Sequence, residues 1–270
     1  MKNFTLVFLL AISFGFARAQ EISPVKLHND VFDLGEELAY KVTFLGMTAG
    51  KAYTRVDKAH HKILGKHCYK VDIFGETSDW ISWVTKVKDN WGTYLDTTNL
   101  MTRASYRKIR EGKYKRDEWV TFDHPSKKAS VQVVDKKTGK YKEAKHYDLI
   151  ENATDLVGGF MHLRFFDFDN VKKGDTLTIR GFFEDACYTL KILYQGKEIV
   201  KTKIGKIPSH ILMPVLPENQ IFDGANSITI WISDDKNRIP VKMSAKMFIG
   251  HTGIELTGFR GLKNSIKVVF

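Results

Sequence analysis

Cysteine, proline and long apolar segments are scarce in this chain, and each scarcity excludes a class of protein. Two cysteines are too few for a scaffold held together by disulfides, and six prolines are too few for a proline-rich, low-complexity chain. After the first nineteen residues, no segment approaches the roughly 20 consecutive apolar residues that cross a bilayer. With 43% hydrophobic residues, the chain is instead typical of a protein that folds around an apolar core.

The two cysteines leave two alternatives open. Cys68 and Cys187 could form a disulfide in an oxidising compartment. In the chain-entropy model, a disulfide that closes so long a loop stabilises the folded state by roughly 4 kcal/mol. Otherwise they are thiols on neighbouring strands that pack as small apolar side chains.

Recognisable catalytic motifs are absent as well. The sequence contains no Gly-x-Ser-x-Gly, no His-Glu-x-x-His, no phosphate-binding glycine loop and no dinucleotide-binding fingerprint. His60, His61 and His67 form a cluster without convincing metal spacing. Adjacent acids such as Glu36-Glu37 and Asp234-Asp235 face apart in a strand or turn, which does not suit general acid–base catalysis. We therefore expect no enzymatic activity, no metal and no cofactor.

The first nineteen residues have the organisation of a secretory signal peptide. Lys2 provides a positive start, and an apolar run follows from Phe4 to Phe16. Ala17-Arg18-Ala19 then has the small-x-small pattern of a cleavage site. This pattern predicts a periplasmic or otherwise exported protein that is soluble after cleavage near Ala19. Residues 20–270 are expected to form a single β-rich domain.

Alternating apolar and polar residues predict β-strands through most of the chain. Leu38, Tyr40, Val42 and Phe44 alternate with neighbours that face the other way, so one face of this strand is expected to be buried. Gln195-Gly196 is predicted to be a turn. Further strands are predicted at residues 49–56, 68–74, 103–110, 114–122, 129–134, 141–147, 175–183, 186–194, 197–203, 227–232 and 239–248.

Two segments depart from this alternation. Residues 152–166 predict a helix with Asn152 or Thr154 as its N-cap. Gly158-Gly159 weakens this helix by about 1 kcal/mol per glycine, which suggests close packing against the sheet. Residues 79–91 hold three of the five tryptophans and predict either a short helix or a bent strand. The fold class is therefore mainly β: a strongly curved antiparallel sheet or half-open barrel with one packed helix.

Positive charge is concentrated in one part of the chain. Residues 103–146 contain fourteen Lys and Arg against six Asp and Glu, a net charge of +8. This segment is either a solvated face that keeps the protein soluble or a contact surface for anionic lipid headgroups. Lys113, Lys115 and Arg116 are the candidate contacts in the second case. Nucleic acid is not expected as a partner of an exported protein.

Several short motifs, taken in their order along the chain, resemble a known family. They include Phe32–Val42, Asp79–Val84, Asp155-Leu156, Leu163-Arg164 and Ile230–Val241. Together they resemble the exported bacterial family named domain of unknown function 3108 (DUF3108). That family implies a periplasmic, β-rich protein and brings no catalytic residues.

The hairpin of residues 230–241 is also similar to one in the periplasmic lipoprotein-carrier (LolA/LolB-like) group. The half-open barrels of that group hold acyl chains on a concave face covered by helices. This second resemblance covers about twelve residues.

Aromatic residues provide the main indication of function. They could line a concave apolar pocket for an acyl chain, or simply fill the core beneath the helix. The candidate ligand-binding residues are Trp80, Trp83, Trp91, Tyr94, Phe160 and Phe165.

Three functional hypotheses follow from these observations. The first is a non-enzymatic periplasmic protein that binds an apolar or amphipathic envelope molecule, such as a lipid or lipoprotein acyl chain. The alternative is a structural or interaction protein of the cell envelope, which has no small-molecule ligand and docks through its basic hairpins. A hydrolase of envelope polymers is the least supported, because no nucleophile or acid motif is present.

Overall fold

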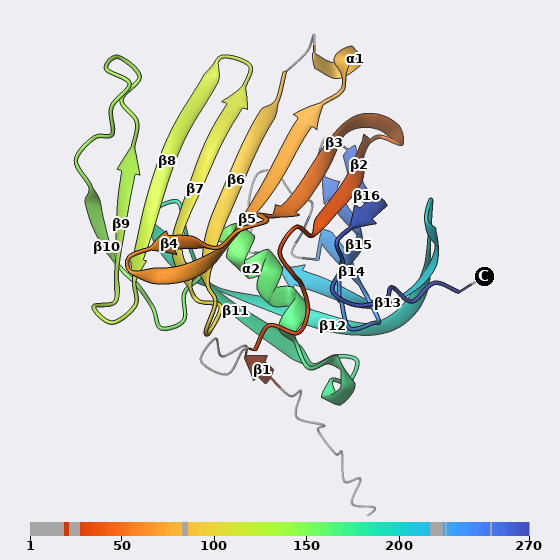
Figure 1. Cartoon of the computed structure of the whole chain (residues 1–270). Coiled ribbons are helices and arrows are strands. Elements are labelled where there is room, and N and C mark those ends of the chain that lie inside the picture. The colour runs from red at the N-terminus through yellow and green to blue at the C-terminus, as the bar shows by residue number, and fades with distance from the viewer. Residues whose placement is uncertain are drawn as a thin grey trace, which may run out of the picture.

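The computed structural model describes residues 19–21, 28–82, 86–216, 224, 226–248 and 250–269 (Figure 1). Residues 1–18 of the predicted signal peptide lie outside these ranges, and so does Trp83. Across the described ranges, the chain contains no helix with the length and apolarity that a membrane span requires.

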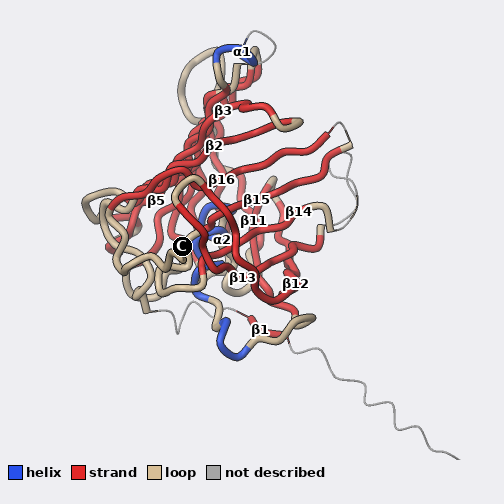
Figure 2. Tube along the Cα trace, turned by 90° about the vertical axis from the view of Figure 1, so that its right-hand side faces the viewer, coloured by secondary structure: helices blue, strands red, loops and turns tan. Residues whose placement is uncertain are grey.

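Within the described ranges, sixteen strands form a single sheet that bends around one concave face (Figures 1 and 2). Neighbouring strands are antiparallel except for the pair β1–β11. The described residues of the edge strands β1 and β10 do not pair with each other, so the sheet is not closed into a barrel. From edge to edge the order is β1 (Ala19–Glu21), β11 (Thr176–Phe183), β12 (Ala186–Thr202), β13 (Gly205–Val215), β14 (Ile228–Ser233), β15 (Pro240–Met247), β16 (Gly250–Arg260), β2 (Glu37–Phe44), β3 (Met47–Val56), β5 (Lys66–Thr77), β6 (Lys88–Asp96), β7 (Thr102–Glu111), β8 (Tyr114–Asp123), β9 (Lys128–Val133) and β10 (Lys145–Asp148), and β4 (His61–Ile63) pairs with β5 outside this path.

Helix α2 (Leu156–His162) packs on the concave face and joins two apolar clusters. Val157 and Met161 belong to a cluster with β5 and β6. Leu163 and Phe166, which follow the helix, belong to a cluster with strands β11 to β14. The predicted fold class, mainly β with one helix packed on a curved antiparallel sheet, is therefore confirmed.

The helix is shorter than predicted, and its N-cap is a different residue. Asp155 is the cap, and its Oδ1 accepts hydrogen bonds from the amides of Val157 at 2.9 Å and Gly158 at 3.2 Å. Neither predicted cap was right. Asn152 lies in the left-handed region with φ 59°, and Thr154 forms a parallel bridge with Gly181 that holds it in extended backbone.

The two helix glycines have different surroundings, which leads to opposite predictions. A Cβ on Gly158 would approach the Thr102 hydroxyl to 2.7 Å and the Thr154 hydroxyl more closely still, whereas a Cβ on Gly159 would lie 3.6 Å from Ile179. We expect Gly158→Ala to lower the free energy of unfolding by about 2 kcal/mol through overpacking. We expect Gly159→Ala to raise it by about 0.5–1 kcal/mol through helix propensity. Urea denaturation of both variants tests this pair, and equal effects would contradict it.

Several strand boundaries differ from the predicted ones. The predicted turn at Gln195-Gly196 is wrong, because β12 continues through it with a bulge between Tyr194 and Gly196. Gly196 has φ 98°, so its glycine signal marks a bulge and not a reversal of the chain. Strand β13 was not predicted, since Pro208 and Pro214 lower its strand signal. Strand β10 begins at Lys145, four residues after the predicted start.

The cysteines do not form a disulfide. Cys68 lies on β5 and Cys187 on β12, and both are free thiols. Cys68 is buried, as the second alternative expects, whereas Cys187 is half-buried and its Sγ accepts a hydrogen bond from the Ile150 amide. The two residues do not lie on neighbouring strands. Burial, together with the nearby carboxylate of Asp96, raises the pKa of the Cys68 thiol to about 11.

Candidate functional site

The six aromatic candidates do not share one face of the sheet. Trp91 points to the concave side, where it stacks on Phe183 with ring centroids 6.0 Å apart. Tyr94 points to the convex side, where its ring lies 6.2 Å from Tyr106 and 5.6 Å from Trp119. Because side chains alternate along a strand, two residues three positions apart face opposite sides. The structure therefore separates Tyr94 from the other described candidates.

The remaining candidates lie in or just after α2, or in and next to the short helix α1. Phe160 and Phe165 are half-buried and pack against the cluster beneath α2. Phe165 also meets Phe32 edge to face at 6.1 Å. Trp80 lies in α1 (Asp79–Ser82), but its side chain is not described. Trp83 lies outside the described residues. Both phenylalanines therefore pack against the apolar core on the concave side of the sheet.

Beyond α2, the concave face continues as a wall of apolar side chains that are only half-buried. The register places Ile254 opposite both Val42 and Met243, and Ile73 opposite Trp91. We call these side chains the apolar wall: Val42, Ile73, Trp91, Leu190, Ile228, Met243 and Ile254, all of them half-buried.

Burial along this face falls with distance from the helix. On β12, Ile192 is fully buried while Leu190 is half-buried, and on β14 Ile230 is 5% exposed while Ile228 is half-buried. Each pair shares a face, because residues two positions apart along a strand point the same way. The apolar wall is therefore the continuation of the core into a region where the described residues cover the side chains only in part.

A charged cluster borders the apolar wall at Trp91. The guanidinium of Arg107 lies between Glu118, at 2.7 Å, and Glu184, at 2.5 Å, and its carbon is 5.3 Å from the centre of the Trp91 ring. Arg116 pairs with the same Glu118. The enclosed space beside this cluster is only about 30 Å³, room for about one water molecule.

Arg107, Glu118 and Glu184 were not predicted from the sequence, because they come from three different strands or turns. Arg116 and Glu118 are two positions apart on the predicted strand, so their side chains are expected on the same face. This spacing was the only local signal for the cluster. The predicted surface contact Arg116 therefore faces the concave side and is already paired, whereas Lys113 and Lys115 are exposed at the β7–β8 turn.

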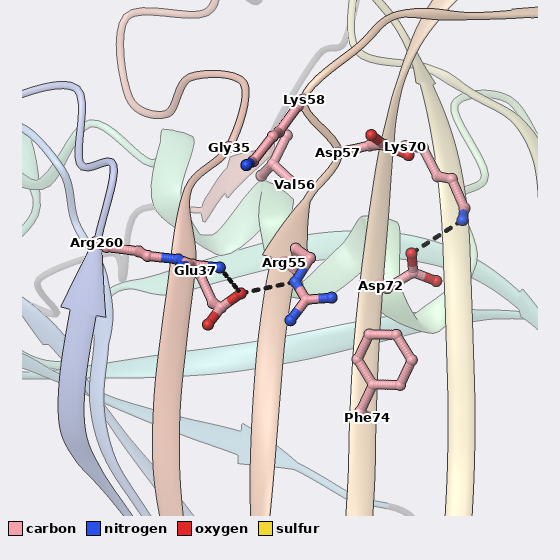
Figure 3. Close-up of a pocket in the computed structure, with 10 residues that line it drawn as sticks. All are labelled: Gly35, Glu37, Arg55, Val56, Asp57, Lys58, Lys70, Asp72, Phe74 and Arg260. Atoms are coloured by element: carbon pink, nitrogen blue, oxygen red, sulfur yellow. Dashed lines mark hydrogen bonds and ion pairs between the residues drawn. The ribbon is translucent and has the colours of Figure 1, made fainter.

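The largest described hollow lies on the opposite, convex face (Figure 3). It has a volume of about 460 Å³ and is lined mostly by charged side chains. Glu37 Oε2 accepts hydrogen bonds from Arg55 at 2.7 Å and from Arg260 at 2.9 Å, and Lys70 pairs with Asp72 at 3.1 Å. These charges satisfy one another on an exposed surface, so the groove offers little to an apolar ligand.

Comparison with solved structures shows which fold this is. A beta-barrel-like protein of domain of unknown function DUF1849 from Brucella abortus is similar, with a TM-score of 0.56 at 11% identity over 85% of this chain and 98% of that one. A protein with a YmcC-like fold from Bacteroides fragilis matches with a TM-score of 0.36 at 7% identity, over 85% and 97% of the two chains. No curated protein matches the chain.

The expected likeness to the lipoprotein-carrier group is not shown by these matches. The family expectation is confirmed: the model of the protein family of unknown function DUF3108 matches residues 39–257. This range includes α2, the whole apolar wall and the charged cluster at Trp91. The chain therefore belongs to the DUF3108 family.

Proposed function

We propose that this chain is a non-enzymatic binding protein of the bacterial cell envelope, exported by its N-terminal signal. Its ligand is an apolar or amphipathic molecule, such as a lipid or a lipoprotein acyl chain, that lies along the apolar wall. The observation that carries this proposal is the half-burial of seven apolar side chains on the concave face, next to clusters that the described residues bury fully. An acyl chain would gain the contacts that the protein leaves unmade.

Exposed apolar residues continue the apolar wall to the ends of its strands. Leu45 in the β2–β3 turn is 58% exposed, Met47 at the start of β3 is 53% exposed, and Phe248 after β15 is 64% exposed. The Leu45 amide donates to the His251 carbonyl at 2.9 Å, so the β2–β3 turn lies beside the start of β16. These exposed side chains would give an apolar ligand further contacts near the ends of the strands that carry the wall.

The small enclosed void limits how the ligand is held. Because the space beside Trp91 is about 30 Å³, an acyl chain would lie along the open wall and not inside a sealed cavity. Such a ligand remains accessible to solvent along one side, which favours exchange with a partner over storage.

The proposal is tested by replacing side chains of the apolar wall with polar ones that are no larger. Met243→Gln combined with Ile254→Thr is expected to weaken binding of cis-parinaric acid at least tenfold, because a buried amide or hydroxyl without a partner costs about 1–3 kcal/mol. Fluorescence titration measures this affinity, and native mass spectrometry of protein from its own envelope identifies the natural adduct.

Ile199→Thr is the matched control, since Ile199 is 59% exposed on β12 and lies outside the apolar wall. It is expected to bind the probe like the unaltered protein. Equal binding by the wall variant and the control would exclude the wall as the site. Absence of any lipid uptake by the unaltered protein would favour the interaction-protein hypothesis instead.

A further inference from the structure

Two neighbouring turns at one end of the sheet form a basic hollow. The β7–β8 turn and the loop after β9 lie at the same end, because Glu118 of β8 pairs with Val133 of β9 and the Val134 amide donates to the Asp117 carbonyl at 2.9 Å. Both are seen at the upper left of Figure 1. The hollow between them has a volume of about 280 Å³, and its lining includes Lys113, Lys115 and Lys136.

These three lysines carry charge that no described carboxylate neutralises. All three are exposed, and none of them forms an ion pair with a described residue. The acids in the lining are already engaged. Asp117 pairs with Arg110 at 2.7 Å, and Asp135 accepts from the amides of Lys137 and Thr138 at 2.8 and 3.1 Å.

The hydrogen bonds to these acids also fix their charge state. The side-chain hydrogen bond from Arg110 lowers the pKa of Asp117, and the backbone amides of Thr138 and Lys137 lower the pKa of Asp135. Both carboxylates are therefore ionised at neutral pH and turned toward their partners. The hollow remains positive on balance, since three ammonium groups are left over.

Two exposed tyrosines stand beside the lysines. Tyr114 is 48% exposed and Tyr141 is 52% exposed, and the ammonium of Lys136 lies 5.4 Å from the centre of the Tyr114 ring. Tyrosine is favoured at a membrane surface because its ring is apolar and its hydroxyl is polar. A small soluble anion would need the lysines alone and would make no use of the exposed rings.

We propose that this end of the sheet docks on an anionic phospholipid bilayer. The phosphate groups of the headgroups enter the hollow between Lys113, Lys115 and Lys136. Tyr114 and Tyr141 lie at the level of the headgroups. The docking surface is distinct from the apolar wall and does not depend on a ligand being bound there.

Vesicle binding tests this docking directly. Full-length mature protein is mixed with vesicles of one part phosphatidylglycerol and two parts phosphatidylcholine, and the bound fraction is measured by co-sedimentation. Each lysine near an anionic surface strengthens binding about fivefold, so the triple variant Lys113→Gln, Lys115→Gln, Lys136→Gln is expected to bind about 100-fold more weakly. Raising the salt concentration should weaken binding of the unaltered protein as well.

The matched control removes three exposed lysines from turns at the opposite end of the sheet: Lys66, Lys203 and Lys236, each changed to Gln. It makes the same change in net charge and is expected to retain most of the binding. Equal weakening in both triple variants would overturn the proposal, because binding would then follow total charge alone.

A second pair of measurements separates a bilayer from a soluble anion. Tyr114→Ser combined with Tyr141→Ser is expected to weaken vesicle binding several-fold and to leave the melting temperature unchanged. Glycerol phosphate at millimolar concentration is expected not to displace vesicles. Displacement by glycerol phosphate, with no effect of the tyrosine changes, would show a site for a free phosphate compound and would overturn bilayer docking.

Discussion

Replacement of Arg164 by methionine is expected to lower the free energy of unfolding by about 3–5 kcal/mol, the largest effect of any single change considered for this chain. Arg164 is completely buried, and its guanidinium forms a two-pronged ion pair with Glu36, at 2.6 Å to Oε1 and 2.9 Å to Oε2. Glu36 is itself only 1% exposed. The substitution would leave its carboxylate buried without a partner, which accounts for most of the expected cost.

The same guanidinium also ties a distant turn to the core. Its Nε and Nη2 donate to the carbonyl oxygen of Asn237 at 3.0 and 2.8 Å. Glu36, Arg164 and Asn237 belong to three of the motifs by which the chain resembles its family. In the structure the three residues form one buried cluster of hydrogen bonds.

A double variant distinguishes the ion pair from the carbonyl contacts. Glu36→Met combined with Arg164→Met removes both charges, so it is expected to recover much of the stability lost in the single variant. Urea denaturation of the single and double variants measures the difference. A double variant as unstable as the single one would show that the bonds to the Asn237 carbonyl, and not the ion pair, are what the fold requires.

Replacement of Asp155 by alanine is expected to cost about 3 kcal/mol. In addition to the amides that it caps, this buried carboxylate accepts hydrogen bonds through Oδ2 from Thr93 at 2.5 Å and Thr102 at 3.0 Å. Loss of a helix cap costs about 1 kcal/mol, and a buried hydroxyl that loses its acceptor, as Thr93 would, costs about 1–3 kcal/mol. Thr102 would keep the Thr154 hydroxyl as a partner. Asp155 thus holds α2 to β6 and β7, and its loss should loosen the helix from the concave face.

Asp155→Asn is the matched comparison. Burial raises the pKa of Asp155, because it disfavours the charged carboxylate, and the four hydrogen bonds that the carboxylate accepts lower the pKa in part. Asparagine has nearly the same shape and keeps one acceptor oxygen, so we expect a loss of only about 1 kcal/mol. Thermal and urea denaturation of both variants check this order. A larger loss with asparagine than with alanine would contradict the role given to the hydrogen bonds.

Local patterns along the chain account for most of the strands but for little of the candidate site. The alternation at Leu38 and Tyr40 predicts β2 correctly, because a side-chain period of two is a property of the strand itself. Strand β13 was not found, since Pro208 and Pro214 lower its strand signal. Both prolines lie just outside residues 209–212, which pair with β14, so that pairing does not need their missing amide donors. Asp155 as the cap was also not found, since its choice over Thr154 depends on a bridge to β11.

Sequence by itself determined that this protein is mainly β, with a helix near residues 152–166, because hydrophobic period and turn chemistry are local properties. Only the tertiary structure decided which side chains meet. It placed Trp91 and Tyr94 on opposite faces, brought Glu36 to Arg164 and left Met243 half-buried. Burial and ion pairing depend on the distance between strands far apart in the chain, and no local pattern encodes that distance.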